Sequence, residues 1–300
     1  MALGGARRSV ARSNGGAGVG LPSFFAYPAF NLSFLWENAA TPRAPPWGKA
    51  RVTEPSTSSI ERTSRVDLAS FPNSGVAVVF GAGGGIGGAL VEALRAADRF
   101  EHVVGFSRNT SPSIDLLDEA SLERAAAFAA SKGDLRLVID ATGFLHDDLQ
   151  GPEKSWRQLD AGKLARSFAL NAIGPALIMK HVLPLLPRSG KAVFATLSAR
   201  VGSIGDNRLG GWYSYRASKA ALNQLVRTAA IELARRCPGA LCIALHPGTV
   251  ATALSAPFAA TGLELHTPAV AAHQLLAVVD QLSPDVNGNF FDWRAKPVPW

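Results

Sequence analysis

The segment Tyr215-Arg216-Ala217-Ser218-Lys219 places a phenol and an ammonium four residues apart. Residues four apart on a helix lie on one face, so the two groups would be neighbours there. A free tyrosine titrates near pH ~10, and an adjacent ammonium lowers the cost of ionising the phenol. The spacing predicts a proton-transfer site, although an ordinary surface pair has the same spacing.

A glycine cluster from Gly81 to Gly87 lies upstream of this pair and directly follows the apolar run Val76 to Phe80. Such a run is typical of a strand buried on both sheet faces. Glycines permit a tight turn, and a following helix offers free amides and a positive dipole to phosphate. The cluster therefore predicts a binding site for a nucleotide pyrophosphate, and the two features together indicate a hydride-transfer enzyme.

The composition suits one large α/β domain or two smaller ones: 300 residues, 47% hydrophobic, with a mean hydropathy of +0.12. The formal charge of +7 is uneven, because residues 1–70 hold eight Lys/Arg against four Asp/Glu and the remainder 22 against 19. This balance gives little support to nucleic-acid binding. Cys237 and Cys242 form no metal-ligand pattern, so we expect buried thiols in a reducing compartment and no metal site.

Residues 1–70 are predicted to be a disordered, low-complexity N-terminal extension, with a Pro- and Ser/Thr-rich linker over 41–70. Arg7, Arg8 and Arg12 with nearby serines resemble an organellar transit sequence. A secretory signal, an unstructured extension and translated sequence upstream of the true start are the alternatives. The apolar stretch 21–36 is too short and too broken by prolines to span a bilayer. The expected location is cytoplasmic, or mitochondrial or chloroplast if the extension is a transit peptide.

From about residue 71 onward, strand and helix patterns alternate with short connections, which is typical of a parallel sheet covered on both faces. The predicted fold is α/β: a single, doubly wound, Rossmann-type parallel sheet over residues 71–300. Strands are expected at 76–80, 102–106, 135–140, 192–197, 241–245 and 289–292, and helices at 89–97, 121–130, 165–183, 214–235 and 268–281.

The spacing of Gly81, Gly85 and Gly87 resembles the T-G-x-x-x-G-x-G pattern of the short-chain dehydrogenase/reductase family, with Phe80 at the Thr position. The resemblance covers about residues 75–300. Segments 141–146, 202–207, 210–216 and 299–300 are similar to the C-factor subgroup, which includes a bacterial cell–cell signalling protein and carbonyl-reductase-like relatives. It implies an NAD(P)-dependent oxidoreductase that transfers a hydride between nicotinamide and a small carbonyl or alcohol substrate. Family members commonly form dimers or tetramers through the helices that carry Asn171 and Tyr215.

Cofactor choice depends on the end of the second strand. No acidic residue follows Phe106, and Arg108 could pair with a 2′-phosphate, so NADP is favoured over NAD; a solvated loop arginine is the alternative. By resemblance, Asp115 and Leu116 would approach the adenine, and the segment 140–143 stands where the family has N-N-A-G. The residues expected to bind the cofactor are Gly81, Gly85, Ile86, Gly87, Ser107, Arg108, Asp115, Leu116, Ala141, Gly143, Tyr215, Lys219, Pro247, Gly248, Val250 and Thr252.

The resemblance also assigns catalytic roles. Tyr215 would be the acid/base, Lys219 would bind the nicotinamide ribose and favour the tyrosinate, and Asn171 would hold a water of the proton relay. The family's catalytic serine position holds Ala199, so Ser198 is the first candidate and Ser203 the second. Ser198 can serve only if the strand end bends, because adjacent strand residues point to opposite faces.

A dinucleotide-binding sensor or signalling protein with weak or no turnover is the competing function. Ala199 favours it, whereas a pure binder needs no proton relay of the kind that Asn171, Tyr215 and Lys219 indicate. The substrate itself is not specified by the sequence. The apolar segment 253–266 is expected to close over it, and the loop 144–158 to border the same cleft.

Overall fold

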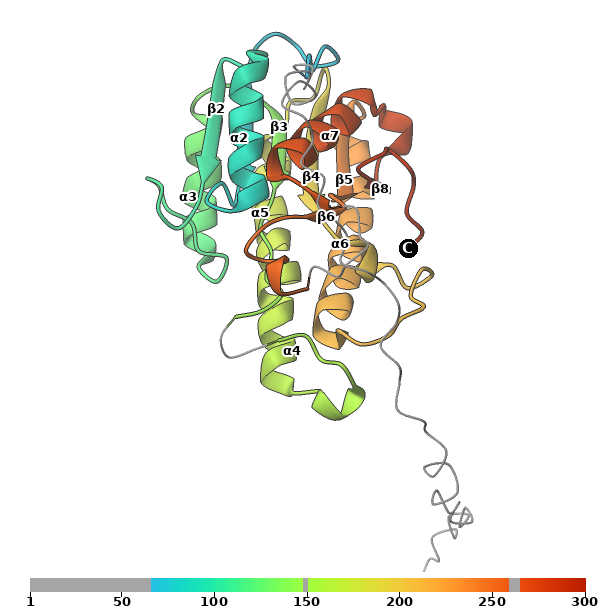
Figure 1. Cartoon of the computed structure of the whole chain (residues 1–300). Coiled ribbons are helices and arrows are strands. Elements are labelled where there is room, and N and C mark those ends of the chain that lie inside the picture. The colour runs from blue at the N-terminus through green and yellow to red at the C-terminus, as the bar shows by residue number, and fades with distance from the viewer. Residues whose placement is uncertain (1–65, 148–150, 259–264) are drawn as a thin grey trace, which may run out of the picture. The chain divides into compact units, whose positions relative to one another are not determined.

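The computed structural model describes residues 66–147, 151–258 and 265–300. The predictions made for residues 1–65, including the transit sequence and most of the linker, lie outside the described residues. In the described part, the strands form one parallel sheet in the order β2-β1-β3-β4-β5-β8 (Figure 1). These strands are β1 (Val76–Phe80), β2 (His102–Phe106), β3 (Leu135–Asp140), β4 (Ala192–Leu197), β5 (Ala240–His246) and β8 (Phe290–Asp292). All six predicted strands and the doubly wound fold are confirmed.

Helices cover both faces of the sheet. One face packs against α2 (Gly85–Ala97) and α7 (Pro268–Gln281). The other packs against α3 (Glu119–Ala130), α5 (Gly174–Val182) and α6 (Tyr213–Arg236). The remaining elements are α4 (Ala161–Phe168), the small parallel pair β6 (Thr249–Val250) and β7 (Leu265–His266), and 3₁₀ turns at Trp156–Gln158, Leu183–Leu185, Arg200–Gly202, Ala256–Phe258 and Pro284–Val286.

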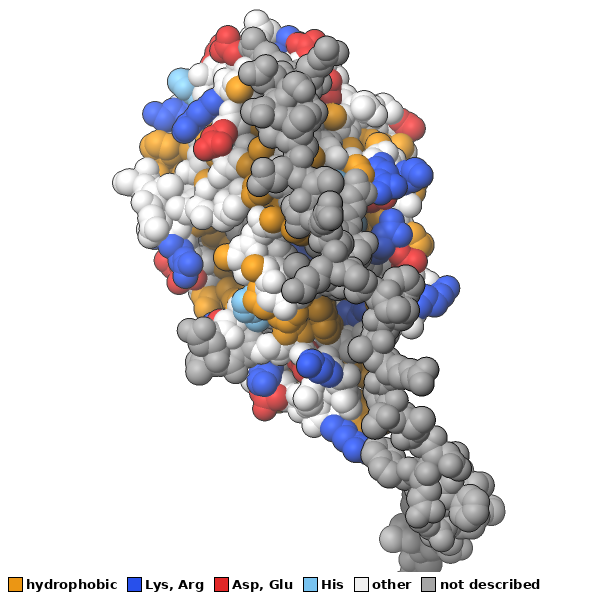
Figure 2. Space-filling model, in the orientation of Figure 1, with side chains coloured by type: hydrophobic (Ala, Val, Ile, Leu, Met, Phe, Trp, Pro, Cys, Tyr) orange, Lys and Arg blue, Asp and Glu red, His pale blue; other side chains and the backbone are white. Residues whose placement is uncertain are grey.

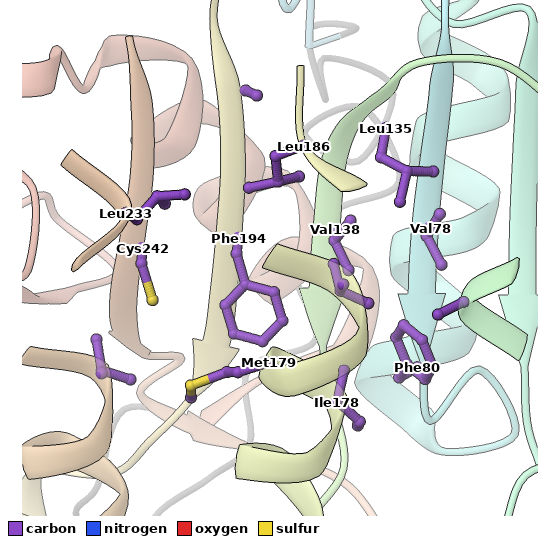
Figure 3. Close-up of a cluster of buried hydrophobic side chains, with 14 of the residues drawn as sticks. Val78, Phe80, Leu135, Val138, Ile178, Met179, Leu186, Phe194, Leu233 and Cys242 are labelled. Carbon is purple, nitrogen blue, oxygen red and sulfur yellow. The ribbon is translucent and has the colours of Figure 1, made fainter. Parts of the chain in front are cut away.

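The apolar strands contribute to a hydrophobic core on each face of the sheet, because alternate residues of a strand point to opposite faces. Figure 3 shows the core on the face covered by α3, α5 and α6, where Val78, Val138 and Phe194 of the sheet lie close to Ile178 and Met179 of α5. Residues in the middle strands are buried on both sides, as β3 and β4 are over their full lengths. The sheet interior is therefore dry and holds the strand ends in fixed register.

The predicted helix 165–183 is wrong in detail, because the structure divides it into α4, a π-helical turn (Ala169–Ile173) and α5. Pro175 has no N–H to donate to the carbonyl of Asn171, so the α-helical pattern cannot continue there. The N–H of Gly174 instead donates to the carbonyl of Ala169, five residues earlier. Such π turns occur frequently at functional sites.

Among the described residues, the run Ala161–Leu185 is long and apolar enough to cross a membrane, with a mean hydropathy of 1.4. Length and composition do not separate such a span from a core helix. Ile178, Met179 and Val182 are buried against the sheet, so the α5 part of this run belongs to the core, and the run is weak evidence for a membrane span.

The boundary between linker and domain lies earlier than predicted. Leu68 is fully buried, Val66 packs against the core, and Ser70 donates to Asp280 of α7 from its backbone N–H at 3.0 Å. These residues belong to the domain because their apolar side chains complete the α2/α7 layer. Cys237 and Cys242 are free and buried, as expected.

Candidate active site

Most of the residues singled out by sequence lie at the carboxyl ends of β1 to β5 and on the first turns of α6, whereas Asn171 lies in the π turn between α4 and α5. In the sheet, β1 lies between β2 and β3, so the chain winds in opposite directions from it. Ligands of open α/β sheets bind in the crevice outside this point, where the strand order reverses. The topology therefore brings the glycine turn and the Tyr-x-x-x-Lys segment to the same edge.

The glycine turn follows β1 directly. Gly81 has a left-handed φ of +86°, which its lack of a side chain permits. Its N–H and that of Ala82 both donate to the carbonyl of Phe106, at 2.8 and 2.9 Å. Phe80, at the family's Thr position, is buried with its ring 5.3 Å from that of Phe106. Backbone bonds to β2 thus brace a turn that lacks the usual hydroxyl.

The start of α2 packs tightly on this turn. A Cβ on Gly87 would lie 2.2 Å from the carbonyl oxygen of Gly81, so only glycine fits. A Cβ on Gly85 would lie 2.9 Å from Cγ2 of Thr252, which places the segment 247–252 against the turn. The helix has no side-chain cap and no acidic residue in its first turn. Its free amides and the narrow cradle between Gly85 and Thr252 fit a pyrophosphate group.

Two segments are predicted to bind the adenosine half of the cofactor, residues 107–108 and residues 115–116, and the structure places them differently. Ser107 lies beside the turn, since a Cβ on Gly83 would be 3.2 Å from Cβ of Ser107, and Arg108 next to it is exposed. Asp115 is exposed and its carboxylate accepts from the N–H of Leu117 at 2.9 Å. The side chain of Leu116 packs near Gly174 at the start of α5. Of these four residues, Ser107 packs against the glycine turn, and Arg108 follows it in the chain.

Asp140 ends β3 as a fully buried carboxylate. One oxygen accepts from the N–H of Thr142 at 3.0 Å and from its hydroxyl at 2.6 Å; the other accepts from the hydroxyl of Thr196 on β4 at 2.7 Å. Burial raises the pKa of Asp140, which these bonds and the charge of Lys219 oppose. Ala141 donates its N–H to the carbonyl of Phe80 at 2.8 Å. The strand end that carries Ala141 and Gly143 is therefore firmly held.

Asn171 braces the loop that follows Gly143. Its Oδ1 accepts from the N–H of Phe144 at 2.7 Å, and its Nδ2 donates to the carbonyl of Phe144 at 2.8 Å. The same Nδ2 donates to Oγ of Ser218 on α6 at 3.1 Å. The side chain of Asn171 thus holds the loop and α6 together. Its backbone carbonyl lies in the π turn, where the usual α-helical donor four residues later is missing because Pro175 has no N–H.

Tyr215 and Lys219 lie on one face of α6. Lys219 is buried and donates from Nζ to the carbonyl of Leu197 at 2.8 Å. A Cβ on Gly143 would be 3.8 Å from this Nζ, so the β3 and β4 ends both meet the ammonium. Burial lowers the pKa of Lys219 to about 8, an effect that the charge of Asp140 opposes.

Burial raises the pKa of the half-buried Tyr215 to about 12. The expectation that Lys219 lowers the pKa of this phenol is therefore wrong for the protein alone. The physical reason is that desolvation disfavours the charged form of each group, raising the tyrosine pKa and lowering the lysine pKa.

Both candidate serines have local partners. Ser198 donates its hydroxyl to Oδ1 of Asn223 at 2.6 Å, one helical turn beyond Lys219. Ser203 is buried and its hydroxyl accepts from the N–H of Asp206 at 3.1 Å. Ala199 occupies the family's serine position in extended conformation. The structure therefore engages Ser198 with the middle of α6.

Two residues near the site had been given no role from sequence. Glu153 is buried, and its carboxylate accepts from the N–H of Ser214 at 3.1 Å and from the hydroxyl of Ser214. Trp212, directly before α6, has a left-handed φ of +53° and donates its N–H to the backbone carbonyl of Glu153. Glu153 lies in a loop without any pattern, so nothing in the sequence marks it. Trp212 was noted only within a segment of the resemblance.

Across residues 66–147, 151–258 and 265–300, no three His, Cys, Asp or Glu side chains are grouped to hold a metal ion. Figure 2 shows Lys, Arg, Asp and Glu side chains of both signs scattered over the uncovered part of one face.

Comparison with known proteins gives the same family from three directions. The family model of short-chain dehydrogenases described as "Enoyl-(Acyl carrier protein) reductase" matches residues 81–277. C-signal of Myxococcus xanthus is 38% identical over 177 residues, which are 59% of this chain and 99% of that protein. The 1-hydroxy-2-glutathionyl-2-methyl-3-butene dehydrogenase of Rhodococcus sp. (strain AD45) is 36% identical over 180 residues, 60% of this chain and 75% of the relative.

Among solved structures, the NADPH-bound carbonyl reductase from chicken fatty liver superposes with a TM-score of 0.67 at 26% identity. The match covers 77% of this chain and 95% of that one.

The two neighbouring glycines of α2 provide a matched test of the cradle. We expect Gly87→Ala to abolish dinucleotide binding, because its Cβ would collide with the carbonyl of Gly81. Gly88→Ala should keep binding and gain up to about 1 kcal/mol of stability, since its Cβ meets nothing closer than 3.4 Å. Titration calorimetry with NADPH and thermal unfolding measure the two effects. Equal affinity of both variants would contradict this placement of the pyrophosphate.

Proposed function

The chain belongs to the short-chain dehydrogenase/reductase family, and from that premise we propose that it is an NADP-dependent carbonyl reductase with Tyr215 as proton donor. Members of this family are oxidoreductases that act on carbonyl or alcohol groups. The observation that carries the proposal is the buried Lys219 ammonium beside Gly143, on the same face of α6 as Tyr215 one helical turn earlier.

NADPH, when bound, supplies a hydride. The residues of this chain supply and stabilise charge: Tyr215, with a pKa of about 12, stays protonated near neutral pH and can give its proton to a substrate oxygen. Lys219, with a pKa of about 8, is mostly charged there and stabilises the phenolate that forms. These protonation states suit reduction; oxidation of an alcohol needs the tyrosinate instead.

The proton has to be replaced after each turnover. Asn171 contributes a backbone carbonyl that lacks its helical donor, because Pro175 follows four residues later. A water accepted at this carbonyl would link Lys219 to solvent. The side chain of Asn171 meanwhile holds Phe144 and Ser218, so one residue would serve as both brace and relay.

A binder without turnover is less consistent with this geometry. A buried ammonium costs free energy unless it is paired, and among the described residues Lys219 has the carbonyl of Leu197 as hydrogen-bond acceptor and the charge of Asp140 as an opposing charge. Dinucleotide binding alone does not need that arrangement beside a phenol. Tyr215 and Lys219 therefore favour an enzyme, even with alanine at position 199.

Two features favour NADP and a homo-oligomer. The exposed guanidinium of Arg108 follows β2 beside Ser107, where a 2′-phosphate would lie, and no carboxylate follows Phe106.

A shallow apolar hollow between α5 and α6, lined by Met179, Leu183 and Leu225 among others, is a surface that a second copy could cover. Light scattering of the purified protein distinguishes monomer, dimer and tetramer.

Tyr215→Phe removes the proton donor and keeps the ring. We expect NADPH oxidation with a panel of carbonyl compounds to fall by about 10³-fold or more, with cofactor affinity nearly unchanged. Tyr213→Phe, on the same helical turn, should retain activity and is the matched control. Equal rates for the two variants, or no NADPH oxidation by the native protein with any compound of the panel, would refute the proposed reductase activity.

Arg108→Ala tests the cofactor choice. Loss of a charge-assisted bond to the 2′-phosphate is expected to raise the KM for NADPH roughly tenfold or more, while the KM for NADH stays the same. Arg124→Ala removes an equal charge from an exposed site on α3 and should change neither constant. Parallel loss with both cofactors would exclude recognition of the phosphate by Arg108.

The pH dependence follows from the buried lysine. Because the pKa of Lys219 is about 8, the ammonium is present below that pH and lost above it. The kcat/KM for NADPH in carbonyl reduction should therefore be level at lower pH and fall as the pH rises through about 8.

In Asp140→Asn the negative charge that favours the ammonium is gone, so the fall should move to lower pH by roughly one unit. Thr196→Val breaks one bond to Asp140 but keeps the charge, and should leave the position of the fall nearly unchanged. A fall that stays in place in Asp140→Asn would show that another group controls it.

A further inference from the structure

An aromatic wall rises on one side of the catalytic phenol. The ring of Trp212 lies 6.2 Å from that of Tyr215 and 5.3 Å from that of Phe258, and the ring of His146 lies 5.2 Å from Phe258. Each contact is edge-to-face, and all four residues are half-buried. Three separate segments build the wall: the loop after β3, the residue before α6 and the 3₁₀ turn after β6.

The backbone of Trp212 is held in an unfavourable conformation to place this ring. Gly210, Gly211 and Trp212 have consecutive φ values of +63°, +64° and +53°. Glycine adopts this region freely, whereas a bulky side chain there costs free energy and persists only where its surroundings enforce it. A glycine at position 212 would adopt this conformation without the cost. We therefore infer that the indole side chain has a role that outweighs the backbone strain.

The surroundings do enforce it. The N–H of Trp212 donates to the carbonyl of Glu153, whose carboxylate binds the next turn through Ser214. Arg216 donates from Nε to the carbonyl of Gly211 at 3.0 Å, and its N–H donates to the carbonyl of Trp212 at 2.8 Å. The indole is thereby fixed relative to the phenol of Tyr215, which lies on the same first turn.

Among the described residues, all four side chains of the wall keep part of their surface exposed. Edge-to-face contacts between rings leave ring faces free, and aromatic faces accept another planar group in offset stacking or edge-on packing. Figure 2 shows hydrophobic side chains exposed beside a His on the lower half of the visible face. Trp212 and Phe258 carry no ionisable group, and the titratable His146 lies on the other side of Phe258, so the part of the wall next to Tyr215 suits an uncharged partner.

Building on the proposed reductase function, we propose that Trp212 determines substrate specificity and that the substrate is a carbonyl compound with a planar, uncharged aromatic substituent. The substituent packs on Trp212 and Phe258 while the carbonyl oxygen meets the hydroxyl of Tyr215. NADPH, when bound, would supply the hydride that reduces the carbonyl carbon and would thereby be oxidised to NADP⁺. The C=O π pair moves to oxygen, which takes the proton of Tyr215 to complete the alcohol, and the phenolate left on Tyr215 is stabilised by Lys219.

Acetophenone and cyclohexyl methyl ketone form the test pair, because they differ in the planarity of one six-membered ring. Their intrinsic reactivities differ, so the readout is the change in the ratio of their kcat/KM values on substitution. Trp212→Leu should lower the aromatic-to-saturated ratio by about fivefold or more, through a higher KM for acetophenone. Trp212→Phe should lose less, and Trp156→Leu, which removes an exposed tryptophan, should leave the ratio unchanged.

Trp212→Gly guards against loss of folding, because it removes the ring together with the backbone strain. We expect this variant to unfold at the same or a higher temperature and yet to lose the same selectivity. Turnover with an unchanged ratio in Trp212→Leu and Trp212→Gly would overturn the role of Trp212 and leave the reductase standing. No NADPH oxidation with either ketone or any other carbonyl compound would overturn the proposed function and this inference together.

Discussion

Burying the ammonium of Lys219 constrains every element around it. An unpaired charge inside a protein costs several kcal/mol, so partners must be in place before the helix docks. Its nearest partner is the carbonyl of Leu197, the last residue of β4, and the nearest buried opposite charge is Asp140, the last residue of β3. Neighbouring parallel strands supply both, in a register that pairs Asp140 with Thr196. The reactive end of the molecule thus depends on where two core strands stop.

The catalytic helix is tied down at three levels, and none of the ties involves Tyr215. Glu153 binds Ser214 on the first turn, Asn171 binds Ser218 on the second, and Ser198 binds Asn223 on the third. The helix can approach β4 closely because a Cβ on Gly202 would meet Cβ of Lys219 at 2.8 Å. This arrangement leaves the phenol free to contact a substrate while its backbone is fixed. It also gives Ser198 a role in positioning α6.

Local patterns in the sequence predicted what depends on local physics. Continuous apolar runs identify strands such as β1 and β4, whose burial on both faces follows from the parallel sheet. Gly81 and Gly87 were found because a tight turn leaves few alternatives to glycine. The division of the helix at Asn171 was also written in the sequence, since Pro175 removes the one N–H that would continue it. The apolar periodicity on either side of Pro175 nonetheless predicts one continuous helix over 165–183.

Other features depend on contacts between distant segments. Glu153 caps a helix that begins sixty residues later, and no spacing rule joins a loop glutamate to a serine so far along the chain. The pKa of Tyr215 was predicted in the wrong direction for a related reason. The sequence shows that an ammonium lies four residues away but does not show how much water the fold removes from both groups, and here that desolvation outweighs their proximity.

Alanine at position 199 makes this electrostatic balance more important for the chemistry. A hydroxyl at that position would share the negative charge that develops on a substrate oxygen. Without it, stabilisation falls to the phenol of Tyr215 and to the ammonium behind it, and a charge in a site of low dielectric acts more strongly than the same charge in water. The burial that lowers the pKa of Lys219 therefore also strengthens the electrostatic stabilisation that its ammonium gives to a nearby negative charge. Under the proposed function, a substrate whose oxygen contacts Tyr215 needs a second contact to orient it, and the indole of Trp212, held one residue before α6, offers one 6.2 Å from the Tyr215 ring.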